Sequence, residues 1–115
     1  MDGDDLWIGT YTGGVNVLNT KTGVFRVYTT KAGDPTTLDR SSSYAIFKDR
    51  EARIWVTSMS GVNLYNREED NFTRIRDLGS WIMDIDQDAD GNIWFSSQGN
   101  GLFKYDPDKQ EWTNY

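Results

Sequence analysis

The chain has 115 residues, of which 37% are hydrophobic and 14% aromatic, and its formal net charge is −6. Its 18 acidic residues outnumber 12 basic ones that form no stripe, which argues against nucleic acid as a partner, because phosphates are bound mainly by clustered cations. Without Cys and His, the chain has no disulfide, no thiol nucleophile and neither the commonest general base nor the commonest transition-metal ligand. No apolar run approaches the roughly 18 residues of a membrane span, so we expect no membrane contact by this segment. The residues after Met1 are acidic and do not form a signal peptide.

Three short segments near the N-terminus show the alternation of polar and apolar residues that is typical of strands. The predicted strands cover Leu6 to Thr10, Val15 to Leu18 and Val24 to Tyr28. The first of them begins with the triplet Leu6-Trp7-Ile8. No helix is predicted here or in the rest of the chain.

Two sets of four strands follow along the chain. The first set is Ser43 to Lys48, Ile54 to Ser58, Val62 to Tyr65 and Asn71 to Ile75. The second set is Trp81 to Asp86, Ile93 to Ser97, Leu102 to Tyr105 and Glu111 to Tyr115. Asp90-Gly91-Asn92, between two strands of the second set, favours the positive φ angles of a tight hairpin turn.

The Trp triplet recurs, and the recurrence indicates a repeat architecture. It returns as Ile54-Trp55-Val56 and Ile93-Trp94-Phe95. A Gly and an aromatic residue follow each copy at an interval of 11 residues, as Gly14 and Phe25, Gly61 and Phe72, Gly101 and Trp112. Repeated four-stranded antiparallel units are typical of β-propeller blades. The alternative is a meander sandwich with accidental similarity, which the constant interval argues against.

The first copy lacks its inner strand, so the sequence predicts an all-β, partial propeller of about two and three-quarter blades. Residues 1–30 form a partial blade of strands two to four, residues 31–76 the inter-blade loop and second blade, and residues 77–115 the third blade. Such a piece cannot close a ring alone. Open strand edges and apolar faces drive association, so we expect the chain to self-associate.

These repeats resemble a known family, the two-component regulator propeller repeats, which occur in the periplasmic sensor regions of bacterial hybrid two-component proteins. The resemblance covers essentially the whole chain and is carried by Leu6-Trp7-Ile8-Gly9-Thr10, Gly13 to Asn19, Phe25-Arg26-Val27-Tyr28, Gly33 to Leu38, Gly61 to Asn66 and Gly101 to Asp106. The copies diverge, since Gly9-Thr10 becomes Thr57-Ser58 and then Ser96-Ser97. The resemblance implies a periplasmic location and an oligosaccharide ligand, and no kinase domain is present here.

Candidate ligand-binding residues are sought in the loops, because the regular Trp residues are expected to pack between blades. In propellers, the loops between second and third strands and between blades commonly meet ligands. The candidates are Tyr11, Arg40, Trp81, Gln98 and Asn100. Trp81 is either a core residue or a surface for sugar stacking. Arg40 is either a solvated loop residue or a bidentate partner for an acidic sugar.

No catalytic residue, metal ligand or cofactor is assigned. Asp86 to Ser97 imitates a calcium loop, with Asp at positions 1, 3 and 5 and Gly at position 6, but Ser97 stands where a bidentate Glu is required. An acidic hairpin turn is the favoured interpretation. No Gly-rich phosphate loop or nucleophile elbow is present.

The sequence therefore predicts a non-enzymatic fragment of a ligand-sensing propeller, responsive to an oligosaccharide. One alternative is a protein-interaction scaffold without a small ligand. Another is a polysaccharide-active enzyme that would use paired carboxylates such as Asp84 and Asp86.

Overall fold

The computed structural model describes residues 1–115 and contains strands and connecting turns but no helix. The strands are β1 (Asp5–Gly9), β2 (Val15–Asn19), β3 (Phe25–Tyr28), β4 (Ser43–Lys48), β5 (Ile54–Ser58), β6 (Gly61–Asn66), β7 (Asn71–Asp77), β8 (Ile82–Gln87), β9 (Ile93–Ser97), β10 (Leu102–Asp106) and β11 (Glu111–Asn114). All the predicted strands are confirmed, with ends shifted by at most two residues. No helix in the structure could span a membrane.

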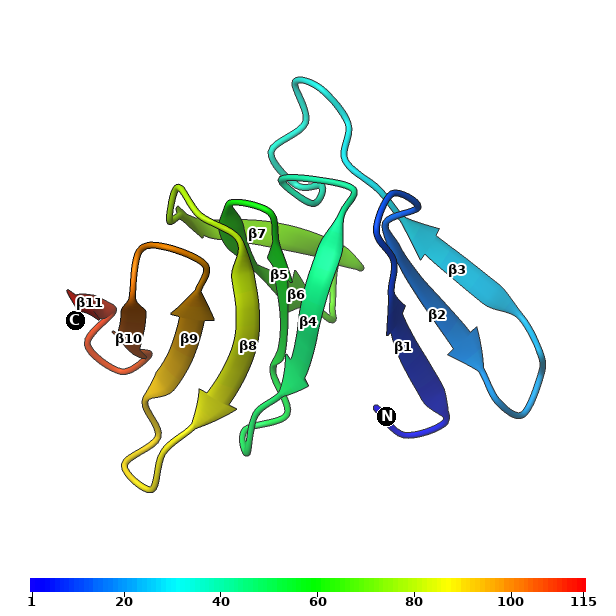
Figure 1. Cartoon of the computed structure of the whole chain (residues 1–115). Helices are drawn as coiled ribbons and strands as arrows, with labels where there is room; N and C mark the ends of the chain where they lie inside the picture. The colour runs from blue at the N-terminus through cyan, green and yellow to red at the C-terminus, as the bar shows by residue number, and fades with distance from the viewer.

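The strands form three antiparallel sheets in chain order. Sheet 1 has the order β1-β2-β3, sheet 2 the order β4-β5-β6-β7, and sheet 3 the order β8-β9-β10-β11. Figure 1 shows the sheets side by side in a row that does not close on itself. Each sheet is a simple meander, because every strand pairs with its neighbour in the sequence through a short turn.

Two apolar clusters hold the row together, one between each pair of neighbouring sheets. Between sheets 1 and 2 the buried residues are Val15, Val17, Leu38, Ile54, Val56 and Phe72, with Trp7 and Tyr28 against them. Between sheets 2 and 3 they are Trp55, Val62, Leu78, Ile82, Ile85, Ile93, Phe95, Phe103 and Tyr105. Alternation along each strand lets a sheet present one apolar face to the sheet before it and the other to the sheet after it.

The repeated Trp residues occupy the same face of their sheets, as the register shows. Trp7 lies opposite Val17 in sheet 1, and Trp55 lies opposite Leu64 in sheet 2. Trp7 meets the ring of Tyr65 edge-on, with centroids 4.8 Å apart, so it packs across to sheet 2 as the sequence predicts. Trp55 packs across to sheet 3, where its ring lies 6.0 Å from that of Phe95.

Trp94 departs from the expectation that all three repeated Trp residues pack between sheets. It lies on the face of sheet 3 that no further sheet covers. Instead, its ring stacks on Tyr115 with centroids 5.6 Å apart, and the Lys104 ammonium lies 5.7 Å from its centroid. The chain therefore covers part of this open face with its own C-terminal residue.

Candidate functional site

The loops that follow β1, β3, β5, β7 and β9 lie on one rim of the row of sheets, because successive strands of a meander alternate in direction. Figure 1 shows these connections along the upper side, together with the first residues of β4 and β8. The five candidate residues from the sequence all lie in or beside these loops. The rim is therefore where a ligand site is sought.

A row of three aromatic rings crosses this rim from sheet 1 to sheet 3, and we call it the aromatic row: Tyr11, Tyr44 and Trp81. Tyr44 and Trp81 are stacked, with centroids 5.6 Å apart and planes at 20°. Tyr11 meets Tyr44 edge-on at 6.3 Å. Trp81 is 38% exposed and Tyr11 is 66% exposed, so the outer rings of the row present free surface to solvent.

Trp81 is partly exposed and is not a core residue. The sequence predicted that it begins a strand, and this is wrong. Strand β8 begins at Ile82, one residue later, and Trp81 belongs to the loop that leads into it. The backbone N–H of Leu78 in that loop donates to the carbonyl of Ser60 at 2.6 Å, and Leu78 is buried between sheets 2 and 3. This anchoring fixes the loop and leaves the indole on the rim.

Gln98 lies directly beside Trp81. Its backbone N–H donates to the carbonyl of Trp81 at 2.8 Å, and the hydroxyl of Ser80 donates to the carbonyl of Gln98 at 2.6 Å. The Gln98 side chain is exposed and has no hydrogen-bond partner within the protein. The rim thus combines an exposed aromatic face with a free amide.

Tyr44 completes the aromatic row, and sequence reasoning missed it. It occupies a β-bulge, where the pairing of β4 with β5 shifts register between Ser43 and Ala45. A bulge re-aims a side chain that strict alternation would place elsewhere. The same shift occurs in β8 between Ile82 and Asp84, and there Met83 is the bulged residue. For this second bulge the sequence carries a signal, since Ile82 and Ile85 are both apolar although a spacing of three does not fit one face of a regular strand.

The hydroxyl of Tyr44 is buried but has no hydrogen-bond partner. Burial raises the pKa of this phenol, and the nearby Tyr11 acts in the same direction. A buried hydroxyl without a partner is uncommon in folded proteins.

The side chains of Asn100 and Arg40 are bonded within the protein. The Asn100 side-chain amide donates to the carbonyl of Leu78 at 3.2 Å, so it braces the loop before β8. The Arg40 guanidinium donates to the carbonyl of Asp39 at 3.0 Å. It lines a separate cavity of about 190 Å³, together with Asp39, Ser60, Arg74, Arg76 and Asp77. The structure therefore brings together Tyr11, Trp81 and Gln98, with Asn100 bracing the loop that carries Trp81, and leaves Arg40 in a separate cavity.

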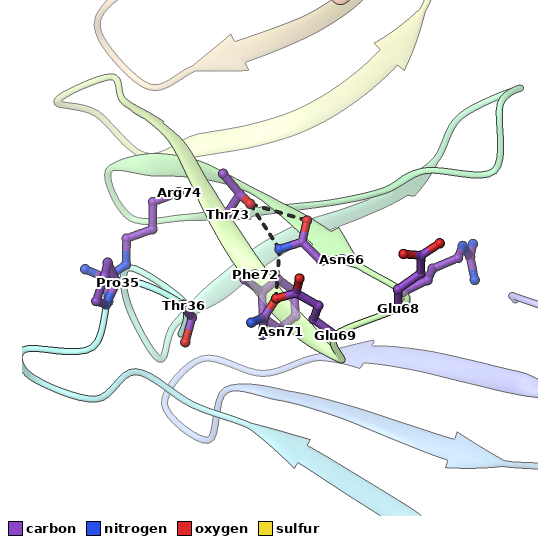
Figure 2. Close-up of a pocket in the computed structure, with 10 residues that line it drawn as sticks. Pro35, Thr36, Asn66, Glu68, Glu69, Asn71, Phe72, Thr73 and Arg74 are labelled. Carbon is purple, nitrogen blue, oxygen red and sulfur yellow. Dashed lines mark hydrogen bonds between the residues drawn. The ribbon is translucent and has the colours of Figure 1, made fainter.

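The largest hollow of the structure lies elsewhere, at the outer edge of sheet 2. This groove of about 750 Å³ runs between the β3–β4 loop and the β6–β7 hairpin, and Figure 2 shows its lining residues. Its one apolar residue, Phe72, is buried. The Asn66 amide donates to Asn71 at 2.8 Å and to Thr73 at 3.0 Å. The groove offers no exposed aromatic face and its amides already pair with one another, so we place the candidate site at the aromatic row.

The calcium-like pattern after Asp86 is a hairpin turn in the structure. One oxygen of Asp88 accepts the backbone N–H groups of Asp90 and Asn92 at 3.0 and 2.9 Å. The other accepts the indole N–H of Trp94 at 2.8 Å. The carboxylate therefore stabilises the turn, and no group of three or more acidic side chains is arranged to hold a metal ion.

Comparisons with known proteins give likenesses in fold alone. No protein-family model matches the chain, and no curated protein matches its sequence. Among solved structures, it is similar to the extracellular domain of the "putative hybrid two component system BT3049" from B. thetaiotaomicron, with a TM-score of 0.86 and 20% identity over 97% of this chain. It is also similar to the extracellular domain of BT4673 from the same organism, with a TM-score of 0.88 and 19% identity over 99% of this chain. The chain spans 16% of the length of each of these structures. It thus has the fold of a part of such extracellular domains.

Proposed function

We propose that this chain is part of a periplasmic, non-enzymatic β-propeller that senses an oligosaccharide for a bacterial two-component system. Each sheet would be one blade, and sheet 1 would be a blade without its inner strand. Two features support this proposal: the repeated packing of each sheet on the next through equivalent faces, and the likeness in fold to extracellular domains of such systems.

The observation that carries the ligand class is the aromatic row. Flat rings suit the apolar C–H faces of pyranose sugars, since stacking buries apolar area on both partners without leaving a polar group unpaired. The free amide of Gln98 supplies a polar group beside the rings. A few polar groups around an apolar surface are typical of small-molecule sites.

Binding at this rim would act on signalling by a shift of populations. The row joins residues from all three sheets, since Tyr11 follows β1, Tyr44 lies in β4 and Trp81 precedes β8. A ligand that touches all three therefore binds best when the sheets hold one relative arrangement. The ligand stabilises that arrangement over any other by the difference between its affinities for the two arrangements.

The test is a titration of the chain with a panel of neutral and acidic oligosaccharides, in which calorimetry and tryptophan fluorescence measure binding. We expect Trp81→Ala to weaken binding at least tenfold, because it removes an exposed stacking face worth about 1.4 kcal/mol or more. Phe25→Ala is the matched control, since Phe25 is an exposed aromatic on the far side of sheet 1. Equal affinity of the Trp81→Ala variant would contradict the proposal.

A second candidate function is a protein-interaction scaffold, and one observation favours it. Val24, Phe25 and Val27 are all more than half exposed on and beside β3. Exposed apolar patches mark interaction sites. No hit on a glycan array, together with a protein partner that the Phe25→Ala variant fails to bind, would favour the scaffold.

A further inference from the structure

Three arginines line the cavity of about 190 Å³ that contains Arg40, and we call it the arginine cavity. Its lining residues are Asp39, Arg40, Ser60, Arg74, Arg76 and Asp77. Arg40 belongs to the β3–β4 loop, and the other two arginines belong to β7. None of the three forms an ion pair, although the chain has a net charge of −6. The cavity therefore gathers unpaired cations in an acidic protein.

The two aspartates of the arginine cavity are bonded to other groups. The Oδ1 of Asp39 accepts from the amide of Asn63 at 2.8 Å, and its Oδ2 accepts from the hydroxyl of Ser58 at 3.0 Å. The Oδ1 of Asp77 accepts the backbone N–H of Gly79 at 2.8 Å, and its Oδ2 has no partner. The arginines therefore have no carboxylate in direct contact, and one carboxylate oxygen is free to accept from a hydroxyl group.

A β-bulge in β7 brings two arginines to the cavity. Arg74 and Arg76 lie opposite two consecutive residues of β6, so Ile75 between them is an extra residue. Ile75 packs against the apolar cluster between sheets 2 and 3, and the arginine on either side of it lines the cavity. A bulge re-aims side chains in this way.

The protein positions the guanidinium groups but leaves some of their donors free. The Nε and Nη2 of Arg74 donate to backbone carbonyls of the β3–β4 loop at 3.0 to 3.2 Å, and its Nη1 has no partner. The Arg76 guanidinium lies 5.4 Å from the ring centroid of Trp112, and its N–H groups have no acceptor. Arg40 donates only from Nη1, to the preceding carbonyl at 3.0 Å. The free N–H groups are donors suited to an anion.

We infer that the arginine cavity binds a sulfate group carried by an oligosaccharide, an inference that rests on the proposed function. A planar carboxylate is matched by a single guanidinium, whereas the oxygens of a sulfate point in several directions and suit guanidinium groups from different elements. The free Oδ2 of Asp77 suits a ligand that also carries hydroxyl groups. Pockets for whole small molecules have roughly 300 Å³ or more, so this smaller cavity fits one charged group of a larger ligand.

The arginine cavity is connected to the aromatic row through the loop before β8. Ser60 lines the cavity, and its carbonyl accepts the backbone N–H of Leu78 at 2.6 Å, in the loop that leads to Trp81. Arg40 comes four residues before Tyr44, so their Cα atoms are at most about 14 Å apart. A short oligosaccharide that stacks on the aromatic row can therefore place a sulfate group in the cavity.

The first experiment titrates the unchanged chain with sodium sulfate, at an ionic strength kept constant with sodium chloride. Nuclear magnetic resonance follows the arginine Nε–H signals, and we expect saturable shifts at Arg40 and Arg76. Arg76→Gln and Arg40→Gln should each weaken sulfate binding about tenfold, because each removes a charge-assisted hydrogen bond. Arg50→Gln is the matched control and should leave binding unchanged, since Arg50 is an exposed arginine of the β4–β5 turn that bonds to the carbonyl of Asp88 at 2.7 Å.

The second experiment distinguishes a sulfate on a sugar from a free ion. Calorimetry compares a tetrasaccharide of a sulfated galactan with the same tetrasaccharide after chemical desulfation. We expect the sulfated form to bind at least tenfold more tightly, and Arg76→Gln to remove this preference without changing the affinity for the desulfated form. Trp81→Ala should weaken both tetrasaccharides and leave the binding of inorganic sulfate unchanged, which separates the aromatic row from the cavity.

The absence of shifts at Arg40 and Arg76 in the sulfate titration would overturn the inference. Equal affinity of the two tetrasaccharides would overturn the sugar as the carrier of the sulfate and leave the aromatic row as the oligosaccharide site. Binding of inorganic sulfate in the cavity without binding of either tetrasaccharide would contradict the proposed function and would assign the cavity to a free anion.

Discussion

The carboxylate of Asp49 is buried and organises the turn between β4 and β5. Its Oδ1 accepts the backbone N–H groups of Glu51 and Arg53, at 3.0 and 2.9 Å. Its Oδ2 accepts the guanidinium of Arg53 at 2.5 Å and the indole of Trp55 at 2.8 Å. One side chain thus joins a turn, an ion pair and a core aromatic residue.

The first prediction concerns this carboxylate. We expect Asp49→Ala to lower the free energy of unfolding by about 3 kcal/mol, because it leaves the buried indole N–H of Trp55 without an acceptor. Asp88→Ala is the matched variant and should cost less, because Asp88 and Trp94 are only half-buried. Urea denaturation followed by tryptophan fluorescence measures both. A larger loss of stability for Asp88→Ala than for Asp49→Ala would contradict the role given to the buried Asp49 carboxylate.

The second prediction is that the stability of the fold depends on pH through hydrogen-bonded aspartate carboxylates. Burial alone would raise the pKa of Asp49, but the hydrogen bonds from Trp55 and Arg53 outweigh it and hold that pKa below the usual 3.8. The hydrogen bond from Trp94 lowers the pKa of Asp88, and the one from Arg67 lowers that of Asp2. A folded-state pKa below the unfolded one stabilises the protein above the unfolded value, and this stability is lost as the pH falls.

We therefore expect these carboxylates to keep stability level between pH 7 and pH 5 and to lower it as the pH falls below about 4. The free energy of unfolding in urea at several pH values checks this expectation. Asp49→Asn should be less stable at pH 7 and should lose less on acidification, because it cannot titrate. A steep loss of stability between pH 7 and pH 5 would mean that other groups dominate.

At the scale of strands and turns, the repeated Gly residues serve two different purposes. Gly14 and Gly101 have φ angles of 75° and 82°, a conformation that L side chains rarely adopt. A Cβ on Gly14 would also collide with the carbonyl of Tyr28, and one on Gly101 with that of Tyr115. Gly61 has no such angle, but a Cβ there would collide with the backbone carbonyl of Arg76 and with the carboxylate of Asp39. The same repeat position is thus restricted to Gly for different reasons.

The third prediction follows from Gly14. Gly14→Ala should lower the free energy of unfolding by about 3 kcal/mol or more, because it adds a steric clash with β3 to the strain of a positive φ. Gly23→Ala is the control, since Gly23 has the same φ of 75° but open space around it, and should cost about 1 kcal/mol. Thermal unfolding of the two variants measures the difference. Equal costs would show that the clash with Tyr28 is relieved by a backbone shift.

At the scale of the whole molecule, the two ends of the row of sheets are unequal. Sheet 3 covers Trp94 on its open face with Tyr115 and Lys104. Sheet 1 leaves Phe25 and Val27 exposed on its open face. In a row of sheets that pack by equivalent faces, these two open faces are the ones that would meet in a head-to-tail contact between two copies.

The fourth prediction is that the chain self-associates in this way. We expect sedimentation equilibrium at tens of micromolar to show species larger than one chain. Phe25→Arg should shift the distribution toward single chains by placing a charge in the contact. Ala89→Arg adds the same charge to the exposed turn between β8 and β9 and should have little effect. A well-folded single chain for the unchanged protein would contradict the prediction.

Much of the fold could be predicted from the sequence, because strands and hairpin turns depend on local residues. Alternation located the strands, and Asp90-Gly91-Asn92 marked a turn in which Gly91 does have a φ of 90°. The bulge at Tyr44 was not foreseen, and it is the pairing of β4 with β5 that shows the extra residue. Because the bulge sets the direction of the Tyr44 side chain, the aromatic row could not be predicted from the sequence.

The sequence by itself determined the strands, their division into repeats and the acidic, Cys-free surface, because each depends on residues close together in the chain. Only the tertiary structure decided which loop residues meet. It placed Tyr11, Tyr44 and Trp81 in one row and left Arg40 in a separate cavity. It also showed that the indole of Trp7 is buried without an acceptor while those of Trp55 and Trp94 have one. The physical reason is that contacts between loops of different sheets depend on how the sheets pack, which no local pattern records.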